Sequence, residues 1–233
     1  MKPATVRIIL ALAMQHHWSL KQLDVSNAFL HGLLHEKVFM SQPPGYVDPT
    51  NPSHVCLLHK AVYGLKPAPM AWFESFTTQL FHLGFISSSA DSNLFILHHG
   101  SCVVYLLLYV DDIIVTRNDP SFIDQLITRL SVVSDLKDLG PLRFFLGLQI
   151  EYTPQGLFAH QSKYATNLLT KFNMMDCKPC LTPCSPTMHV NSQTSFVLVD
   201  PTSYSSMVVA LQYLTFTRPN LSYSVQQACQ FMS

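Results

Sequence analysis

Apolar side chains along this chain recur with two different periods, one typical of helices and the other of strands. A spacing of three to four residues predicts helices over residues 3–17, 69–83, 119–133, 162–172, 203–217 and 220–232. Short apolar and β-branched runs bounded by turn residues predict strands over residues 20–25, 38–40, 55–58, 94–98, 102–109, 113–116, 144–151 and 157–161. Residues 173–203 are rich in Pro, Ser, Thr and Cys, which indicates a linker or an extended loop.

The order of these elements favours one class of fold. Helices and hairpins are mixed, without the strict strand–helix alternation that builds a doubly wound parallel sheet. We therefore expect an α+β fold, in which an antiparallel sheet carries packed helices. A chain of 233 residues that is 48% hydrophobic is long enough to bury one sizeable core.

The charge of the chain argues against strong nucleic-acid binding by this chain alone. Lys and Arg number 14, Asp and Glu number 14, and the formal net charge is zero. Proteins that bind nucleic acid usually carry an excess of positive charge, because contacts with phosphates dominate their affinity.

Cysteine content and hydropathy indicate an intracellular protein, in the cytoplasm or the nucleus. Six cysteines in a chain of this length are too few for a secreted disulfide scaffold. The most apolar run, residues 102–115, is too short to cross a membrane and contains Asp111 and Asp112. Residues 6–14 are apolar but are not followed by a small-residue cleavage site, so we expect neither a signal peptide nor a transmembrane segment.

Two adjacent carboxylates, Asp111 and Asp112, follow Tyr109 and Val110 at a tight turn between two apolar strands. Burying two neighbouring anions is costly, because they repel each other and lose hydration. A divalent cation such as Mg²⁺ or Mn²⁺ removes this conflict, since both ions prefer hard oxygen ligands. A solvated turn is the structural alternative, because Asp is common in turns.

A second acidic position strengthens the metal-binding interpretation. Asp24 lies near the end of a separate apolar strand, residues 20–25. Two strands that each end in a carboxylate can share a pair of metal ions. Two-metal catalysis needs this arrangement, because one ion activates the attacking oxygen and the other stabilises the leaving oxygen.

Several motifs in a fixed order carry a resemblance to a known family. Residues 109–112, Tyr-Val-Asp-Asp, resemble the polymerase motif of reverse transcriptases, and residues 23–30, Leu-Asp-Val-Ser-Asn-Ala-Phe-Leu, resemble their first aspartate motif. Further segments resemble the copia-type retrotransposon enzymes in order and spacing: residues 40–46, 63–66, 138–140, 145–148, 210–214 and 217–219. The resemblance to copia-type reverse transcriptases extends over nearly the whole chain.

The resemblance implies a catalytic site that uses Mg²⁺ or Mn²⁺. Asp24 and Asp111 would bind both catalytic ions, with Asp112 as the neighbouring carboxylate and the Val25 carbonyl completing one metal shell. Phe29 would lie under the sugar of the incoming nucleotide and exclude a 2′-hydroxyl by its bulk. A core aromatic residue is the structural alternative for Phe29.

Contacts with the substrates follow from the same resemblance. Tyr109 and Val110 would lie near the primer terminus. The hairpin that grips the primer strand would include Phe145, Leu146 and Gly147. Lys66 is the lysine for which we favour a contact with nucleotide phosphates over a solvent-facing position.

The reaction implied by the resemblance is RNA- or DNA-templated addition of deoxynucleotides to a primer 3′-hydroxyl, with release of pyrophosphate. Such phosphoryl transfer depends on positioned metal ions more than on a protein nucleophile. The implied partners are the template–primer, deoxynucleoside triphosphates and the remaining polyprotein domains, namely integrase and ribonuclease H.

A domain layout also follows from the resemblance. Residues 1–150 would form a polymerase palm, with a partial fingers segment at about residues 36–60. Residues 151–172 would form a thumb-like hairpin and helix, and residues 173–203 a linker. Residues 204–233 would form C-terminal helices that lead toward a ribonuclease H domain, which we expect the chain to lack.

Two positions depart from the family pattern. Pro67 stands where the family usually has a glutamine that borders the nucleotide site, and Met70 stands where a charged residue is usual. Pro67 cannot donate a hydrogen bond, so both changes would weaken nucleotide binding. Basic residues of upstream fingers also have no counterpart before Met1. The alternative function is therefore a catalytically inactive remnant or a non-enzymatic interaction module.

Cys177, Cys180, Cys184 and His189 offer four ligands within one segment, a set that zinc accepts. The same segment contains several prolines, and the resemblance places an ordinary linker there. We therefore favour a linker over a zinc site.

Overall fold

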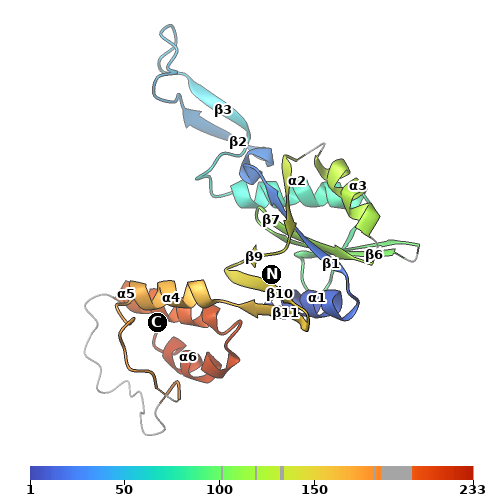
Figure 1. Cartoon of the computed structure of the whole chain (residues 1–233). Coiled ribbons are helices and arrows are strands. Elements are labelled where there is room, and N and C mark those ends of the chain that lie inside the picture. Colours follow the sequence, from blue (N-terminus) through green and yellow to red (C-terminus); the bar gives the residue numbers. More distant parts are fainter. Residues whose placement is uncertain (101, 119, 132–133, 181, 185–200, 233) are drawn as a thin grey trace. The chain divides into compact units, whose positions relative to one another are not determined.

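The computed structural model describes residues 1–100, 102–118, 120–131, 134–180, 182–184 and 201–232. The chain divides into two compact units, Met1–Leu142 and Arg143–Ser233, and each is described by itself. Figure 1 shows the helices and strands of both units along the chain.

The first unit contains a six-stranded sheet in which every neighbouring pair of strands is antiparallel. The strand order is β4-β5-β6-β7-β1-β8, so the first strand of the chain lies between β7 and β8. The strands are β1 (Ser19–Val25), β4 (Ile86–Ser87), β5 (Leu94–His99), β6 (Cys102–Tyr109), β7 (Asp112–Arg117) and β8 (Leu136–Pro141). Strand β6 is largely apolar along its whole length, and β7 is buried from Ile113 to Arg117, as expected for strands that are covered on both faces.

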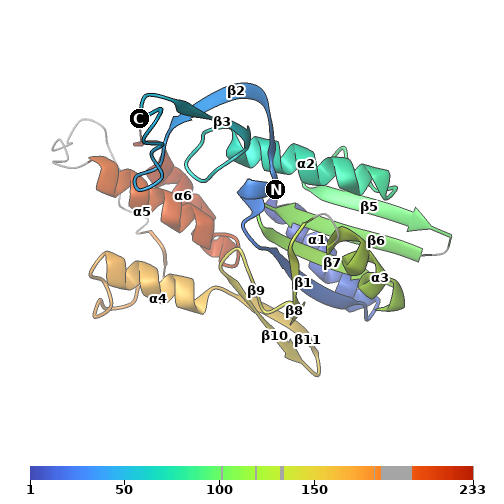
Figure 2. The ribbon, with the colours of Figure 1, turned by 90° about the horizontal axis from the view of Figure 1, so that it is seen from above.

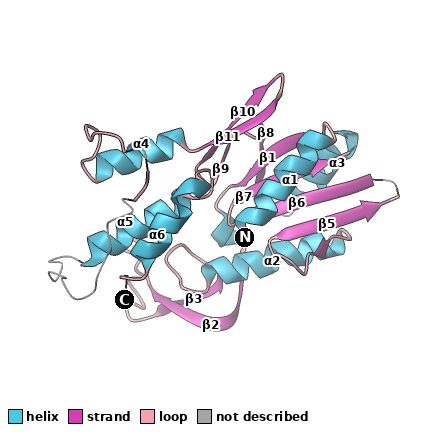
Figure 3. Ribbon diagram, turned by 90° about the horizontal axis from the view of Figure 1, so that it is seen from below, coloured by secondary structure: helices cyan, strands magenta, loops and turns pink. Residues whose placement is uncertain are grey.

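Helices cover both faces of this sheet. Helices α2 (Ala68–His82) and α3 (Pro120–Ser131) lie on one face (Figure 2), and α1 (Pro3–Gln15) lies on the opposite face (Figure 3). The main core cluster combines the buried side of α2 with apolar residues of the sheet, and its large members include Trp72, Phe76, Phe85, Phe95 and Leu108. Helix α1 buries one stripe at helical spacing, formed by Val6, Ile9, Leu10 and Ala13.

A two-stranded ribbon, β2 (Leu33–Ser41) and β3 (Val55–Lys60), extends from the part of this unit that contains the sheet (Figure 1). The short 3-10 helix η1 (Ala28–His31) connects β1 to this ribbon. Phe39 and Leu57, which are opposite each other in the ribbon, are both exposed. The ribbon therefore contributes little to the core.

The second unit contains a three-stranded antiparallel sheet with the order β11-β10-β9. Its elements are β9 (Phe144–Phe145), β10 (Leu148–Thr153), β11 (Gly156–His160), α4 (Ser162–Lys171), α5 (Pro201–Leu214), the 3-10 helix η3 (Pro219–Leu221) and α6 (Ser222–Cys229). Its core is formed by Phe145, Leu148, Ile150, Val208, Leu214 and Val225.

The α+β class predicted from the sequence is confirmed. Strands β4 and β8 were not predicted, and β2 begins at Leu33 rather than at residue 38. The predicted strand over residues 144–151 is interrupted between β9 and β10, where Leu146 and Gly147 have φ values of 49° and 68°. Helix α5 begins at Pro201, inside the segment that was predicted to be a linker.

The assignment of palm, fingers, thumb and linker to these segments stays a prediction. Residues 185–200 of the predicted linker lie outside the described residues. Within the described part of the chain, no helix combines the length and the apolar character needed to cross a membrane.

Candidate active site

The strands that carry the three predicted carboxylates are neighbours in the first unit. Strands β6 and β7 form a hairpin in which Tyr109 pairs with Asp112, so Val110 and Asp111 make the turn. Strand β1 pairs with the other edge of β7, and Asp24 is directly opposite Asp112. The fold therefore brings all three carboxylates to one end of the sheet.

Hydrogen bonds join this end of β1 to the turn. The backbone N–H of Val25 donates to the carbonyl oxygen of Asp111, with 3.0 Å between the two atoms. The side-chain amide of Gln22 donates to a carboxylate oxygen of Asp112 at 3.3 Å. Asp111 is exposed, whereas Asp112 is partly buried. The two adjacent acids therefore have different surroundings.

The pKa of Asp112 is raised above the usual value for an aspartate. Burial is the main cause, because it disfavours the charged form. The hydrogen bond from Gln22 acts in the opposite direction, while the negative charges of Asp111 and Asp24 raise the pKa further. A bound divalent cation would relieve this accumulation of negative charge.

The chemistry of this donor set fits a divalent metal, because Mg²⁺ and Mn²⁺ prefer carboxylate oxygens. As the side chains lie, however, no three His, Cys, Asp or Glu residues in the described part of the chain are grouped closely enough to hold an ion. Asp24, Asp111 and Asp112 share one end of the sheet without converging on one point. Binding of an ion by all three would therefore require rotation of their side chains.

Comparison with known proteins identifies a matching family. Residues 1–186 match the sequence profile of a family described as reverse transcriptase (RNA-dependent DNA polymerase). The chain belongs to this reverse transcriptase family. The copia-type resemblance carried by the motifs is confirmed. Enzymes of this family use a divalent metal ion.

Relatives of the chain include large polyproteins of plant transposons. Two retrovirus-related Pol polyproteins of Arabidopsis thaliana, from transposons RE1 and RE2, are 44% and 43% identical to the chain over 231 residues. A third, from transposon TNT 1-94 of Nicotiana tabacum, is 34% identical over 241 residues. Each alignment covers 99% of the chain, but the chain spans only 16% to 18% of the length of these relatives. No solved structure matches the chain significantly.

The predicted nucleotide contacts lie in the segment between β1 and α2. Phe29 belongs to η1, is partly buried, and has its ring centre 5.1 Å from that of Tyr63. Phe29 also packs against the main core cluster, so a contact with a sugar and a core role are both compatible with its position. Lys66 is exposed in the turn that precedes α2. The roles of Phe29 and Lys66 stay predictions.

The predicted primer contacts fall in both units. Tyr109 and Val110 are 40% and 39% exposed, so both are accessible at the β6–β7 turn. Phe145 is buried in the second unit, and Leu146 and Gly147 form the turn between β9 and β10. The grip on the primer strand by the β9–β10 turn stays a prediction.

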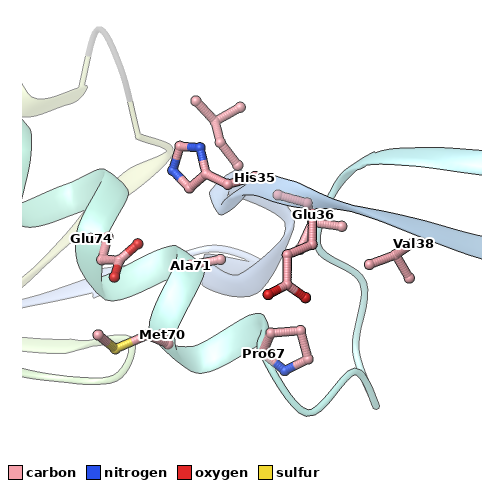
Figure 4. A pocket seen from close by; sticks show the side chains of 9 residues that line it. His35, Glu36, Val38, Pro67, Met70, Ala71 and Glu74 are labelled. Atoms are coloured by element: carbon pink, nitrogen blue, oxygen red, sulfur yellow. The ribbon is translucent and has the colours of Figure 1, made fainter.

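A pocket with a volume of about 140 Å³ lies between β2 and the beginning of α2 (Figure 4). Its lining includes Pro67 and Met70, the two residues that depart from the family pattern, and the acidic residues Glu36 and Glu74. The described residues that line it thus include two carboxylates and His35 but neither Lys nor Arg, so the pocket offers little attraction for the phosphates of a nucleotide.

The cysteines of the predicted linker do not form a metal site within the described residues. Cys177 and Cys180 are exposed, and Cys184 is partly exposed. His189 lies outside the described residues. The preference for a linker over a zinc site therefore stays a prediction.

Two residues that contact the carboxylate turn were missed in the sequence. Gln22 lies two residues before Asp24 in the same strand, and residues at i and i+2 share one face of a strand, so this spacing was the signal that could have identified it. Trp72 donates from its indole N–H to the carbonyl oxygen of Val110, at 2.7 Å. A side chain that bonds to a backbone carbonyl leaves no pattern in the sequence, so this contact required the structure.

Proposed function

We propose that the chain carries out templated DNA synthesis, in which deoxynucleotides are added to a primer 3′-hydroxyl on an RNA or DNA template. The observation that carries the proposal is the pairing of Asp24 with Asp112, one residue from Asp111, at one end of an antiparallel sheet. Membership of the reverse transcriptase family supports the same reaction. We expect synthesis in the cytoplasm or the nucleus, where templates and nucleotides occur.

Three carboxylates would hold the metal ions in this reaction. Asp24 and Asp111 would bind two Mg²⁺ ions, or Mn²⁺ ions in their place, with Asp112 beside them and the Val25 carbonyl completing one shell. When bound, the ions would supply activation of the primer hydroxyl and stabilisation of the leaving pyrophosphate oxygen. The hydrogen bond from Val25 to Asp111 keeps β1 in register with the turn, so that Asp24 and Asp111 remain at the same end of the sheet.

Other residues would orient the substrates. The Phe29 ring would contact the sugar of the incoming nucleotide, and the Lys66 ammonium group would neutralise its phosphates. Tyr109 and Val110 would contact the primer terminus, and the primer strand would be gripped by Phe145, Leu146 and Gly147. The exposure of Tyr109, Val110 and Lys66 is what these roles require.

The remaining parts of a Pol polyprotein, integrase and ribonuclease H, would be the protein partners. The relatives described above are Pol polyproteins, and the chain spans 16% of the two from Arabidopsis thaliana. A net charge of zero is a further reason to expect partners, because the chain alone provides little attraction for a template.

Metal binding by the purified chain is the first test. We expect calorimetric titration with Mn²⁺ and Mg²⁺ to show binding that is lost when Asp111 and Asp112 are both changed to Asn. The double change Glu36→Gln with Glu74→Gln removes two other carboxylates and is the matched control for non-specific cation binding. Equal binding by all three proteins would refute the metal site, and primer extension by the unaltered chain would then be absent.

A further inference from the structure

The turn that presents Asp111 and Asp112 contains one residue in an unfavourable backbone conformation. Val110 has a φ of 55°, in the left-handed region. A β-branched residue is rarely found there, because its side chain crowds its own backbone. Such a conformation persists only where surrounding contacts hold it in place.

Two hydrogen bonds hold successive carbonyl groups of this turn. The indole N–H of Trp72 donates to the carbonyl of Val110, with 2.7 Å between Nε1 and the oxygen. The backbone N–H of Val25 donates to the carbonyl of Asp111 at 3.0 Å. The first donor belongs to α2 and the second to β1, so two separate elements of the first unit fix the turn.

Trp72 is itself held firmly by the core. Its side chain is 1% exposed, and its ring centre lies 5.0 Å from that of Phe76 and 6.0 Å from that of His31. Trp72 also belongs to the same core cluster as Leu23 and Val25 of β1. A side chain packed in this way has little rotational freedom, so its N–H is a fixed donor.

We propose that Trp72 is a positioning residue, whose indole N–H holds the Val110 carbonyl so that the turn presents Asp111 and Asp112 beside Asp24. The proposal rests on the function proposed above, in which these carboxylates bind metal. A role in packing alone makes a different prediction. Phenylalanine fills much of the space of tryptophan but has no N–H, so Trp72→Phe keeps most of the packing and removes the hydrogen bond.

The chain contains two tryptophans, which provides a matched control. Trp18 stacks on His16 and Tyr105, with ring centres at 4.9 Å and 6.1 Å, and Trp18→Phe removes the other indole. A ¹⁵N-labelled chain of 26.3 kDa is suitable for nuclear magnetic resonance, and loss of one indole signal in each variant assigns both signals.

Two measurements on these variants test the proposal. We expect Trp72→Phe to shift the backbone amide signals of Val110, Asp111 and Asp112, and Trp18→Phe to leave them in place. We also expect Trp72→Phe to weaken Mn²⁺ binding about tenfold, as for other residues that orient metal ligands, while Trp18→Phe binds as the unaltered chain does. Unchanged turn signals together with unchanged Mn²⁺ affinity in Trp72→Phe would overturn the proposal.

The outcomes separate this proposal from the proposed function. If the variant with Asp111 and Asp112 both changed to Asn binds Mn²⁺ as well as the unaltered chain does, the proposed function fails. The amide signals alone then decide the role of Trp72. If Trp72→Phe does not fold, the scalar coupling across the hydrogen bond, between the indole nitrogen of Trp72 and the carbonyl carbon of Val110, decides instead in the unaltered chain labelled with ¹⁵N and ¹³C. A resolved coupling supports the hydrogen bond, and its absence overturns it.

Discussion

A Cβ atom on Gly32 would lie 2.7 Å from the backbone nitrogen of Trp72 and 2.9 Å from the carbonyl carbon of Ala71. Gly32 follows η1, and its φ of −70° is one that any residue adopts. Close contact with the backbone of α2, rather than conformational freedom, is therefore the reason that glycine is required there.

We expect Gly32→Ala to lower the free energy of unfolding by about 1–3 kcal/mol, because the added methyl group displaces α2 from the chain after η1. Urea denaturation measures the change. Gly45→Asn is the control, since Gly45 has a φ of 85°, no atom lies within 4 Å of its Cβ position, and Asn tolerates that backbone region. A Gly32→Ala chain as stable as the unaltered protein would show that α2 moves aside without cost.

The sequence predicts the fold well where burial imposes a pattern and poorly where it does not. Strands β1, β6 and β7 were found because their apolar residues are buried in the sheet. Strand β8 contains Lys137, Asp138 and Gly140 and is mostly exposed, so no alternation of apolar residues marked it. Its strand conformation comes from pairing with β1, which lies far away in the sequence.

The candidate site also could be predicted from the sequence only in part. Asp24, Asp111 and Asp112 were identified from the sequence because carboxylates at the ends of apolar strands are unusual. The position of Asp24 directly opposite Asp112 depends on strand register, and only the structure supplies it. The hydrogen bond from Trp72 to Val110 involves a backbone carbonyl, so neither periodicity nor composition indicates it.

Asp91 joins the beginning of α1 to the segment before β5. Its carboxylate accepts hydrogen bonds from the backbone N–H of Lys2 and the hydroxyl of Thr5, each at 2.7 Å, and from the N–H of Asn93 at 3.1 Å. Burial alone would raise the pKa of Asp91, but these hydrogen bonds and the N-terminal amino group outweigh it and lower the pKa.

The lowered pKa makes the contribution of Asp91 to stability depend on pH. That contribution is complete at pH values above the pKa of Asp91 in the unfolded chain, which is about 3.9. It is lost as the pH falls through the lower pKa of Asp91 in the folded chain. We expect Asp91→Asn to lower the free energy of unfolding by about 1–3 kcal/mol at pH 7. The difference from the unaltered chain should shrink below about pH 4, as measured by urea denaturation at several pH values.

Asp176→Asn is the control for the change of charge in this experiment, because Asp176 is exposed in the second unit. It should leave the free energy of unfolding within about 0.5 kcal/mol of the unaltered chain. A stability difference for Asp91→Asn that stays constant from pH 7 to pH 3 would contradict the assignment to its ionised carboxylate.

Phe29 allows the two interpretations of its ring to be separated. If the ring excludes a 2′-hydroxyl, Phe29→Ala should improve binding of ribonucleotides relative to deoxynucleotides, by up to about 100-fold. Competition between dATP and ATP for the chain bound to template–primer measures the ratio. Phe73→Ala is the matched control, because Phe73 is also partly buried against the main core cluster. A lower stability in both variants without a changed ratio in Phe29→Ala would identify Phe29 as a core residue.

Lys66 and Lys21 differ in the partners that the fold gives them. Lys21 donates to Asp124 at 2.8 Å and to Asp138 at 3.0 Å, so its charge is already paired. The pKa of Lys21 is raised, mainly by the hydrogen bond to Asp124. Burial lowers this pKa, and the hydrogen bond to Asp138 raises it further. Lys66 is exposed, and its charge is available to a nucleotide phosphate.

We therefore expect Lys66→Gln to weaken binding of a fluorescent deoxynucleoside triphosphate about tenfold or more, because a charge-assisted hydrogen bond contributes about 1.5–3 kcal/mol. Fluorescence anisotropy in the presence of template–primer measures the affinity without requiring turnover. Lys21→Gln removes the same charge and should leave the affinity unchanged, while it lowers stability by at most about 1 kcal/mol and less in high salt. Equal loss of nucleotide affinity in the two variants would mean that net charge, rather than a contact with Lys66, determines binding.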